Sequence, residues 1–210
     1  MSVNFNPYVQ GWAHAGNAPS GSGQPWGYDG QPPSVFGALP SFNSTLPKLP
    51  PPSEFAMYHI TGFSPTILNA SVVGPRGQTH LRIITDPASP HHTIWRDAQR
   101  RTVAMVDWGT RSTVEMPGLL ARQSVRSWLR LSSDRTTRTM EVRGMHYAWA
   151  PVDQYICLYY THGSQSVVLA RVCRVADGVS VEVTQRAMQY GLLEVCILCA
   201  TLFLCGQNID

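Results

Sequence analysis

The sequence predicts a mainly β fold, a closed β-barrel of about twelve strands around one buried hydrophobic helix. Three observations lead to this expectation. From about residue 54 onward, short runs of Val, Ile, Leu and Thr alternate with turn-forming sequences, as in domains built from many short strands. One long helix is expected at about 184–205, and its apolar part, from Leu192 to Cys205, must be buried. Residues 1–52 differ from the rest in composition, so the 210 residues divide into a tail, 1–52, and one domain, 53–210.

The first 52 residues predict a disordered tail. They carry ten prolines and seven glycines but only two charged side chains, Asp29 and Lys48. Such a segment cannot bury enough apolar surface to offset the entropy lost on ordering. The sequence PKLP at 47–50 has the spacing of an SH3 ligand, but it lacks a flanking arginine, so we expect a passive tail.

The body of the chain contains repeated turn signals, such as GPRG, DPASP, HGS and ADG. Between them the pattern predicts strands at 55–60, 66–73, 78–84, 92–96, 101–107, 111–115, 137–143, 145–150, 154–161, 166–175 and 179–183. A helical turn is expected in SVRSWLRL. Ten to twelve strands at this spacing indicate a sandwich or a barrel rather than βαβ units.

The central helix is expected over about 184–205, with Thr184 as its N-cap. From Leu192 to Cys205 it is apolar on every face except at Glu194, so it must be surrounded by lipid or by protein. Fourteen residues span only about 21 Å, less than the roughly 30 Å of a bilayer core, and the glutamate makes insertion marginal. A barrel of more than about ten strands needs filling, which favours burial inside the protein. The helix residues expected in the core are Leu192, Leu193, Val195, Ile197, Leu198, Leu202 and Phe203.

Residues 55–210 also resemble a known family, on the strand pair TIWRDAQRRTVAMVDW, the strand VSVEVT and the ending LLEVCIL through CGQNID. The chain is similar to an uncharacterised fungal domain family of unknown function. That family is related to the tubby C-terminal-like superfamily, which includes the LURP-one-related proteins and the phospholipid scramblases. The resemblance implies a tubby-like, twelve-stranded barrel around the C-terminal helix, and it leaves the activity open because a fold does not carry a function.

Arginines dominate the charge, with fifteen of them against the single Lys48. Between Arg96 and Arg143 there are ten arginines and five acids, a local surplus of five positive charges. This surplus makes Arg96, Arg100 and Arg101 candidates for binding acidic phospholipids. The alternative is that outward arginines only keep the strands soluble.

The remaining motifs predict no catalytic, metal or cofactor site. Cys196 and Cys199 form a C-x-x-C in the middle of the apolar helix, where core packing is the better interpretation. His91 and His92 would point to opposite faces of a strand, and GVSVE lacks the second glycine of an esterase elbow.

We therefore expect a binding or adaptor module that is not an enzyme and needs no cofactor. The expected partners are an acidic phospholipid or a protein, with no nucleic acid, and the expected state is a monomer. The odd set of five cysteines and the absence of a signal-peptide pattern at the first residues favour the cytoplasm, with a peripheral membrane association. The alternative is a scramblase-like or tail-anchored membrane protein with the terminal helix inserted.

Overall fold

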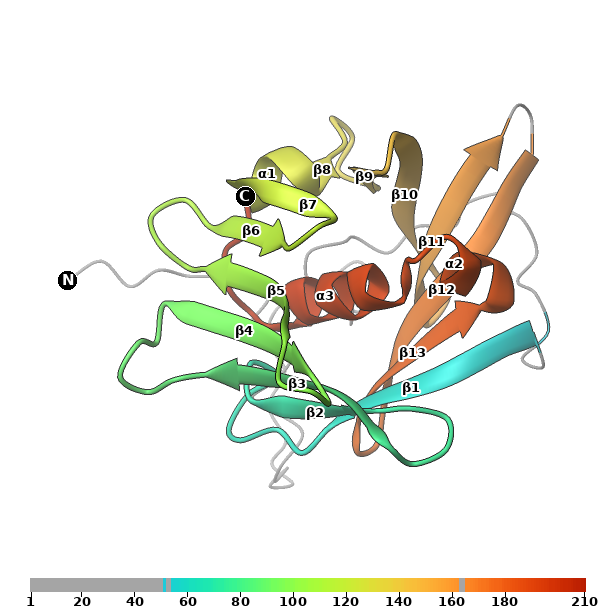
Figure 1. Cartoon of the computed structure of the whole chain (residues 1–210). Helices are drawn as coiled ribbons and strands as arrows, with labels where there is room; N and C mark the ends of the chain where they lie inside the picture. The colour runs from blue at the N-terminus through green and yellow to red at the C-terminus, as the bar shows by residue number, and fades with distance from the viewer. Residues whose placement is uncertain (1–50, 52–53, 163–164) are drawn as a thin grey trace, which may run out of the picture.

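The computed structural model describes residues 51, 54–162 and 165–210 (Figure 1). The disordered tail expected over 1–52 therefore lies, apart from Pro51, outside the described residues.

The described residues form a 13-stranded antiparallel sheet with three helices. Its strand order is β7-β6-β5-β4-β3-β2-β1-β13-β12-β11-β10-β9-β8. Strands adjacent in the chain pair with each other except β7 and β8, and β1 pairs in addition with β13. The strands are β1 Phe55–Thr61, β2 Ala70–Val73, β3 Thr79–Thr85, β4 His92–Asp97, β5 Thr102–Asp107, β6 Thr113–Met116, β7 Leu120–Ser124, β8 Arg130–Leu131, β9 Arg138–Val142, β10 Met145–Val152, β11 Tyr155–His162, β12 Gln165–Val175 and β13 Gly178–Thr184. The helices are α1 Val125–Trp128, α2 Gln185–Gln189 and α3 Leu193–Leu204.

The expected mainly β fold is confirmed, but the expectation of a closed barrel is wrong. β7 pairs only with β6 and β8 only with β9, so in the described part of the chain the two outer strands do not close the sheet. β8 has only two residues, too few to form a ladder along the whole edge. The short helix α1 lies between β7 and β8 in the chain, and its buried Val125 and Trp128 cover the core in place of a strand pair.

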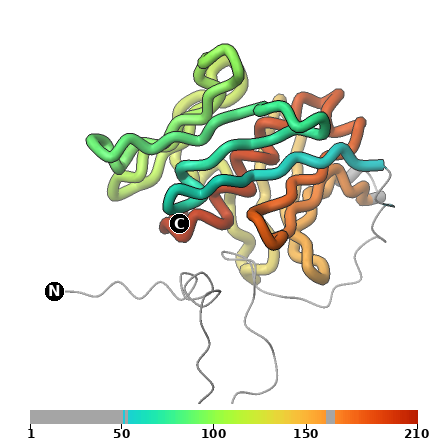
Figure 2. The backbone as a smooth tube through the Cα atoms, turned by 90° about the horizontal axis from the view of Figure 1, so that it is seen from below, coloured from blue at the N-terminus to red at the C-terminus, as the bar shows by residue number. Residues whose placement is uncertain are grey.

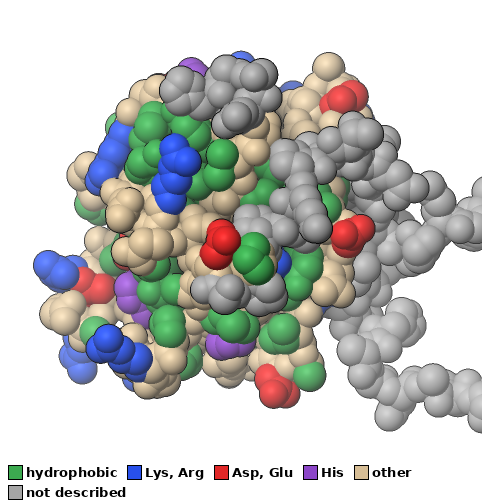
Figure 3. All heavy atoms as spheres, turned by 90° about the vertical axis from the view of Figure 1, so that its right-hand side faces the viewer, with side chains coloured by type: hydrophobic (Ala, Val, Ile, Leu, Met, Phe, Trp, Pro, Cys, Tyr) green, Lys and Arg blue, Asp and Glu red, His purple; other side chains and the backbone are tan. Residues whose placement is uncertain are grey.

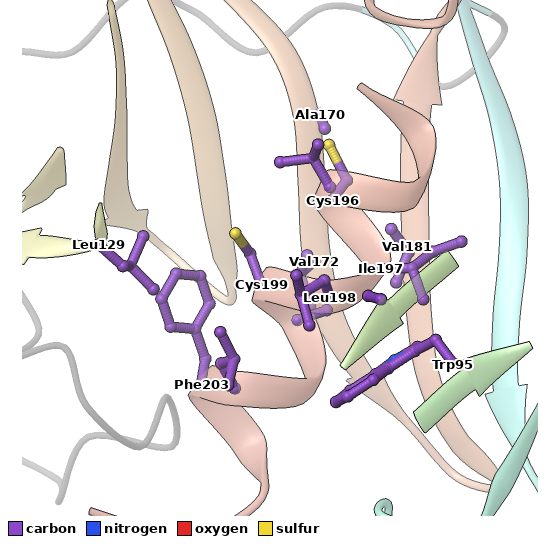
Figure 4. Packing of buried hydrophobic residues seen from close by; sticks show 14 of the residues in the cluster. Trp95, Leu129, Ala170, Val172, Val181, Cys196, Ile197, Leu198, Cys199 and Phe203 are labelled. Carbon is purple, nitrogen blue, oxygen red and sulfur yellow. The ribbon is translucent and has the colours of Figure 1, made fainter. Parts of the chain in front are cut away.

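The sheet curves around α3, which lies in its interior (Figure 1), and β1 to β3 cross one side of the helix (Figure 2). Every residue of α3 except Glu194 is buried. Figure 4 shows Leu198 and Ile197 near Trp95 of β4 and Val181 of β13. The residues expected in the helix core, Leu192, Leu193, Val195, Ile197, Leu198, Leu202 and Phe203, are all buried.

The sequence predicted one helix over 184–205, but the structure has two, α2 and α3, with a turn between them. Thr184 caps α2 as expected, because its Oγ1 accepts a hydrogen bond from Ala187 N at 3.2 Å. The chain then turns at Gly191, whose φ of +70° suits glycine, and a Cβ there would lie 3.2 Å from Arg143 Nη1. Among the described residues, no helix is both long enough and apolar enough to cross a membrane.

Candidate functional site

Two arginines lie directly opposite each other on the outer face of the sheet. Arg82 of β3 is in register with Arg96 of β4, and both are exposed. Their orientation follows from the alternation of the strands, which turns Ile83 and Trp95 into the core. Like charges at opposite positions of a strand pair destabilise it, so this arrangement has a cost in folding free energy.

The next cross-strand pair on this face is apolar. Ile84 of β3 is in register with Ile94 of β4, and Ile84 is 38% exposed. The outer face of this strand pair thus presents cationic and aliphatic side chains beside each other.

The hairpin between β4 and β5 carries the other two candidate arginines. Asp97 Oδ1 accepts hydrogen bonds from the backbone of Gln99 and Arg101 at 2.9 and 2.8 Å, and Arg101 Nε donates to Asp97 Oδ2 at 2.7 Å. Desolvation acts to raise the pKa of Asp97, but these hydrogen bonds outweigh it and lower the pKa. Arg100 has a φ of 63°, a left-handed conformation that costs a residue with a side chain roughly 1 kcal/mol. The four residues Arg82, Arg96, Arg100 and Arg101 are called the basic strip below.

The structure thus brings Arg96, Arg100 and Arg101 together on one hairpin, but it divides the remaining arginines of the 96–143 region. Of these, Arg122 and Arg138 form ion pairs with Asp107 and Asp210, as Arg101 of the hairpin does with Asp97. Arg111 and Arg135 lie in the connections β5–β6 and β8–β9, at the other end of the sheet from the β4–β5 hairpin. The surplus of positive charge that the sequence suggested is therefore not concentrated on one surface.

Arg82 belongs to the strip although it lies outside the arginine-rich region 96–143. The sequence feature that points to Arg82 is the hairpin across DPASP. It pairs HLRII with HTIWRD and places an arginine from each strand on the same face.

A cavity of about 690 Å³ lies beside the hairpin, over the start of α3. Its lining includes Arg101, Arg143, His80 and Glu194. His80 reaches this position through a β-bulge: Val72 pairs with Leu81 and Val73 with Thr79, which leaves the histidine as an extra residue.

His80 Nε2 lies 3.3 Å from Glu194 Oε1, within ion-pair distance but outside hydrogen-bond geometry. The interaction with His80 lowers the pKa of Glu194, although burial acts to raise it. This pair explains how the one charged residue of α3 is accommodated beside an apolar core. Two acids, Asp97 and Glu194, offset the two arginines that line the cavity, so it is a polar hollow without a strong net charge.

The side of the sheet formed by β10 to β12 has a different character. Cys157 and Tyr159 alternate with core residues along β11, so they belong to a second apolar cluster on the outer face. Arg171 is buried there, with Nε donating to Glu182 Oε2 at 2.6 Å and its guanidinium 4.4 Å from the centroid of the Phe55 ring. Figure 3 views the molecule from this side, and the coloured part of its surface shows hydrophobic side chains between a few charged ones.

The cysteine pair of α3 is part of the core. Cys196 and Cys199 are fully buried, and burial raises the pKa of both thiols. Cys199 Sγ lies 3.8 Å from Met140 Sδ. Within the described residues, no three His, Cys, Asp or Glu side chains are grouped in a way that could hold a metal ion.

Comparison with known proteins gives little further information. No protein-family model and no curated protein matches the chain. Among solved structures, the X-ray structure of a protein from Arabidopsis thaliana, AT5G01750, is similar with a TM-score of 0.44 and 11% identity, over 72% of this chain and 96% of that chain.

Proposed function

We propose that this chain is a tubby-like, non-catalytic binding module of the cytoplasm that associates peripherally with membranes and recognises acidic phospholipid head groups through the basic strip. The observation that carries the proposal is the exposed pair Arg82 and Arg96, directly opposite each other in register. A repulsive pair that weakens the sheet is compensated when an anionic group binds between the two guanidinium groups.

The neighbouring side chains favour a membrane surface as the source of that anion. Arginine's planar fork suits phosphate, and Ile84 and Ile94 offer aliphatic surface next to the charges. Arg100 extends the positive surface along the hairpin, whereas Arg101 is partly neutralised by Asp97. Each basic side chain near an anionic surface contributes about 1 kcal/mol, screened over a Debye length of roughly 8 to 10 Å.

Liposome sedimentation tests the proposal, with neutral phosphatidylcholine vesicles and with vesicles that contain phosphatidylserine or phosphoinositides. Binding should require the anionic lipid and weaken as salt rises. The variant Arg96→Gln/Arg100→Gln/Arg101→Gln should bind about 30- to 150-fold more weakly, since it loses roughly two to three such contributions. The matched control, Arg111→Gln/Arg126→Gln/Arg135→Gln, has the same net charge but leaves the strip intact, so it should bind as the unmodified chain does.

Absence of binding to strongly anionic vesicles at low salt would refute the lipid proposal and favour a protein partner. Equal losses in both triple variants would show that only net charge matters. Protein that stays with the membrane after carbonate washing would instead support the alternative of an inserted terminal helix.

A further inference from the structure

β7, one outer strand of the open sheet, and β9, which lies next to the other outer strand, line one cavity of about 570 Å³. β7 contributes Leu120, Ala121 and Gln123 to it, and β9 contributes Met140 and Glu141. In the part of the chain that the structure describes, β7 pairs with β6 alone, and this section of β9 pairs with β10 alone. Among the described residues, β7 therefore has one whole edge without a strand partner, and β9 has part of one edge without a strand partner. Such an edge is a template for an additional strand.

The space between β7 and residues 140–142 of β9 is called the seam below. The helix α1 occupies only part of it. Trp128 Nε1 donates a hydrogen bond to Glu141 O at 3.3 Å, so a side chain takes the place of a neighbouring strand at one position. A narrow void next to the cavity shares Leu120 and Trp128 with it and reaches Val195 of α3. The seam thus combines backbone hydrogen-bonding groups with access to apolar side chains.

The charges of the seam indicate the chemistry of its partner. Arg130 and Arg143 line the cavity, and among the described residues neither has an acidic group within 4 Å. Glu141 is the acid of the lining, and its Oε2 lies 3.9 Å from His146 Nδ1. Arg143 has a φ of 53° in the turn between β9 and β10, a position where Asn or Asp is usual.

We propose that this seam binds an extended acidic segment of a partner protein, which adds to β7 as an antiparallel strand. β7 has five residues and is about 17 Å long, so it offers a ladder for a segment of similar length. Side chains of the segment alternate between the two faces, with apolar ones toward Trp128 and acidic ones toward Arg130 and Arg143. Arg143 also lines the cavity beside Arg101, but the seam shares no residue with the basic strip and does not depend on the lipid proposal.

Fluorescence anisotropy tests the inference with the full chain and a fluorescein-labelled peptide, Glu-Val-Thr-Val-Glu-Val-Glu. Two control peptides accompany it: one has Lys in place of each Glu, and one has N-methylated Val residues, which keep the charge but cannot donate to a strand edge. We expect saturable binding of the first peptide and at least tenfold weaker binding of both controls.

Variants of the chain separate the seam from general electrostatic attraction. Arg130→Gln/Arg143→Gln should weaken peptide binding at least tenfold, whereas Arg96→Gln/Arg100→Gln, with the same change in charge, should leave it unchanged. Thermal unfolding of both variants verifies that they fold. Bound peptide should also slow hydrogen exchange in β7 but not in β2.

Several results would overturn the inference. They are equal weakening by both double variants, equal binding of the N-methylated peptide, or no binding at millimolar peptide. Concentration-dependent dimerisation that protects β7 without peptide would assign the seam to a second copy of the chain instead.

Discussion

Arg138 and Asp210 form an ion pair. We expect replacement of Asp210 to lower the free energy of unfolding much more than replacement of Arg138. The Arg138 side chain is 0% exposed, whereas that of Asp210 is 43% exposed. Arg138 Nη1 donates to Leu129 O at 3.0 Å and to Asp210 Oδ1 at 2.9 Å, and Nη2 donates to Asp210 Oδ2 at 2.6 Å. The pair ties the segment after α3 to β9.

The magnitudes follow from which group is left buried. Asp210→Ala leaves a guanidinium in the core with Leu129 O as its remaining acceptor, and an uncompensated buried charge costs about 3 to 5 kcal/mol. Arg138→Met removes that charge and leaves Asp210 to be hydrated, so the expected loss is the unpaired carbonyl, about 1 to 3 kcal/mol. The double variant should resemble Arg138→Met and not the sum of the two.

Urea denaturation followed by tryptophan fluorescence measures these differences. With an m-value of about 2 kcal/mol/M, a loss of about 4 kcal/mol lowers the midpoint by about 2 M. Asp177→Ala, which removes an exposed acid from the turn between β12 and β13, is the matched control and should change little. A cost below about 1 kcal/mol for Asp210→Ala, or additive costs in the double variant, would refute the reasoning.

Three further predictions concern the core, the pH dependence and the domain boundary. Phe203→Ala should lower the free energy of unfolding by about 3 to 5 kcal/mol, because Phe203 is 3% exposed and its ring packs edge-on against Trp149, with the ring centroids 5.3 Å apart. Urea denaturation measures this loss. The pKa of Glu194 is lowered in the folded state, so its carboxylate stabilises the fold above the unfolded pKa and this contribution is lost as pH falls through the folded pKa. Thermal melts between about pH 5 and 3 should therefore fall less steeply for Glu194→Gln than for the unmodified chain; equal slopes would contradict this. A lysine-specific protease should cut once, after Lys48, and leave the melting temperature unchanged, because the described core lies C-terminal to the cut; a loss of several degrees would show that residues 1–48 stabilise the domain.

Strands that alternate between apolar and polar residues were predictable from the sequence, even where the polar face is also buried, as at Ser180 and Glu182 of β13. β13 is an example, because VSVEV alternates strictly and its valines all point into the core. β7 was missed because Ala121, Arg122 and Gln123 are exposed on the open edge, so no alternation of apolar and polar residues marks it. β8 has two residues, fewer than any periodicity can reveal.

The candidate site was predictable only in part. The hairpin that joins Arg96 to Arg101 is local in sequence, and the structure places these residues together. The contribution of Arg82 depends on the register between β3 and β4, and the approach of His80 to Glu194 depends on a β-bulge. Register and bulges are set by pairing between strands, which the sequence of a single strand does not specify.

The open sheet also shows that burial of the helix does not require a closed barrel. An apolar helix requires that water be excluded from every side, and a ladder of backbone hydrogen bonds is one way to do so. Here Val125, Trp128 and Leu129 cover α3 at the seam, and Ile209, buried after α3, adds to the same core. Side chains thus meet the demand for burial, while among the described residues β7 and residues 140–142 of β9 each keep an edge without a strand partner. Hydrophobic pattern therefore determines what is covered, and the hydrogen bonds of the outer strands determine where the fold remains able to accept another strand.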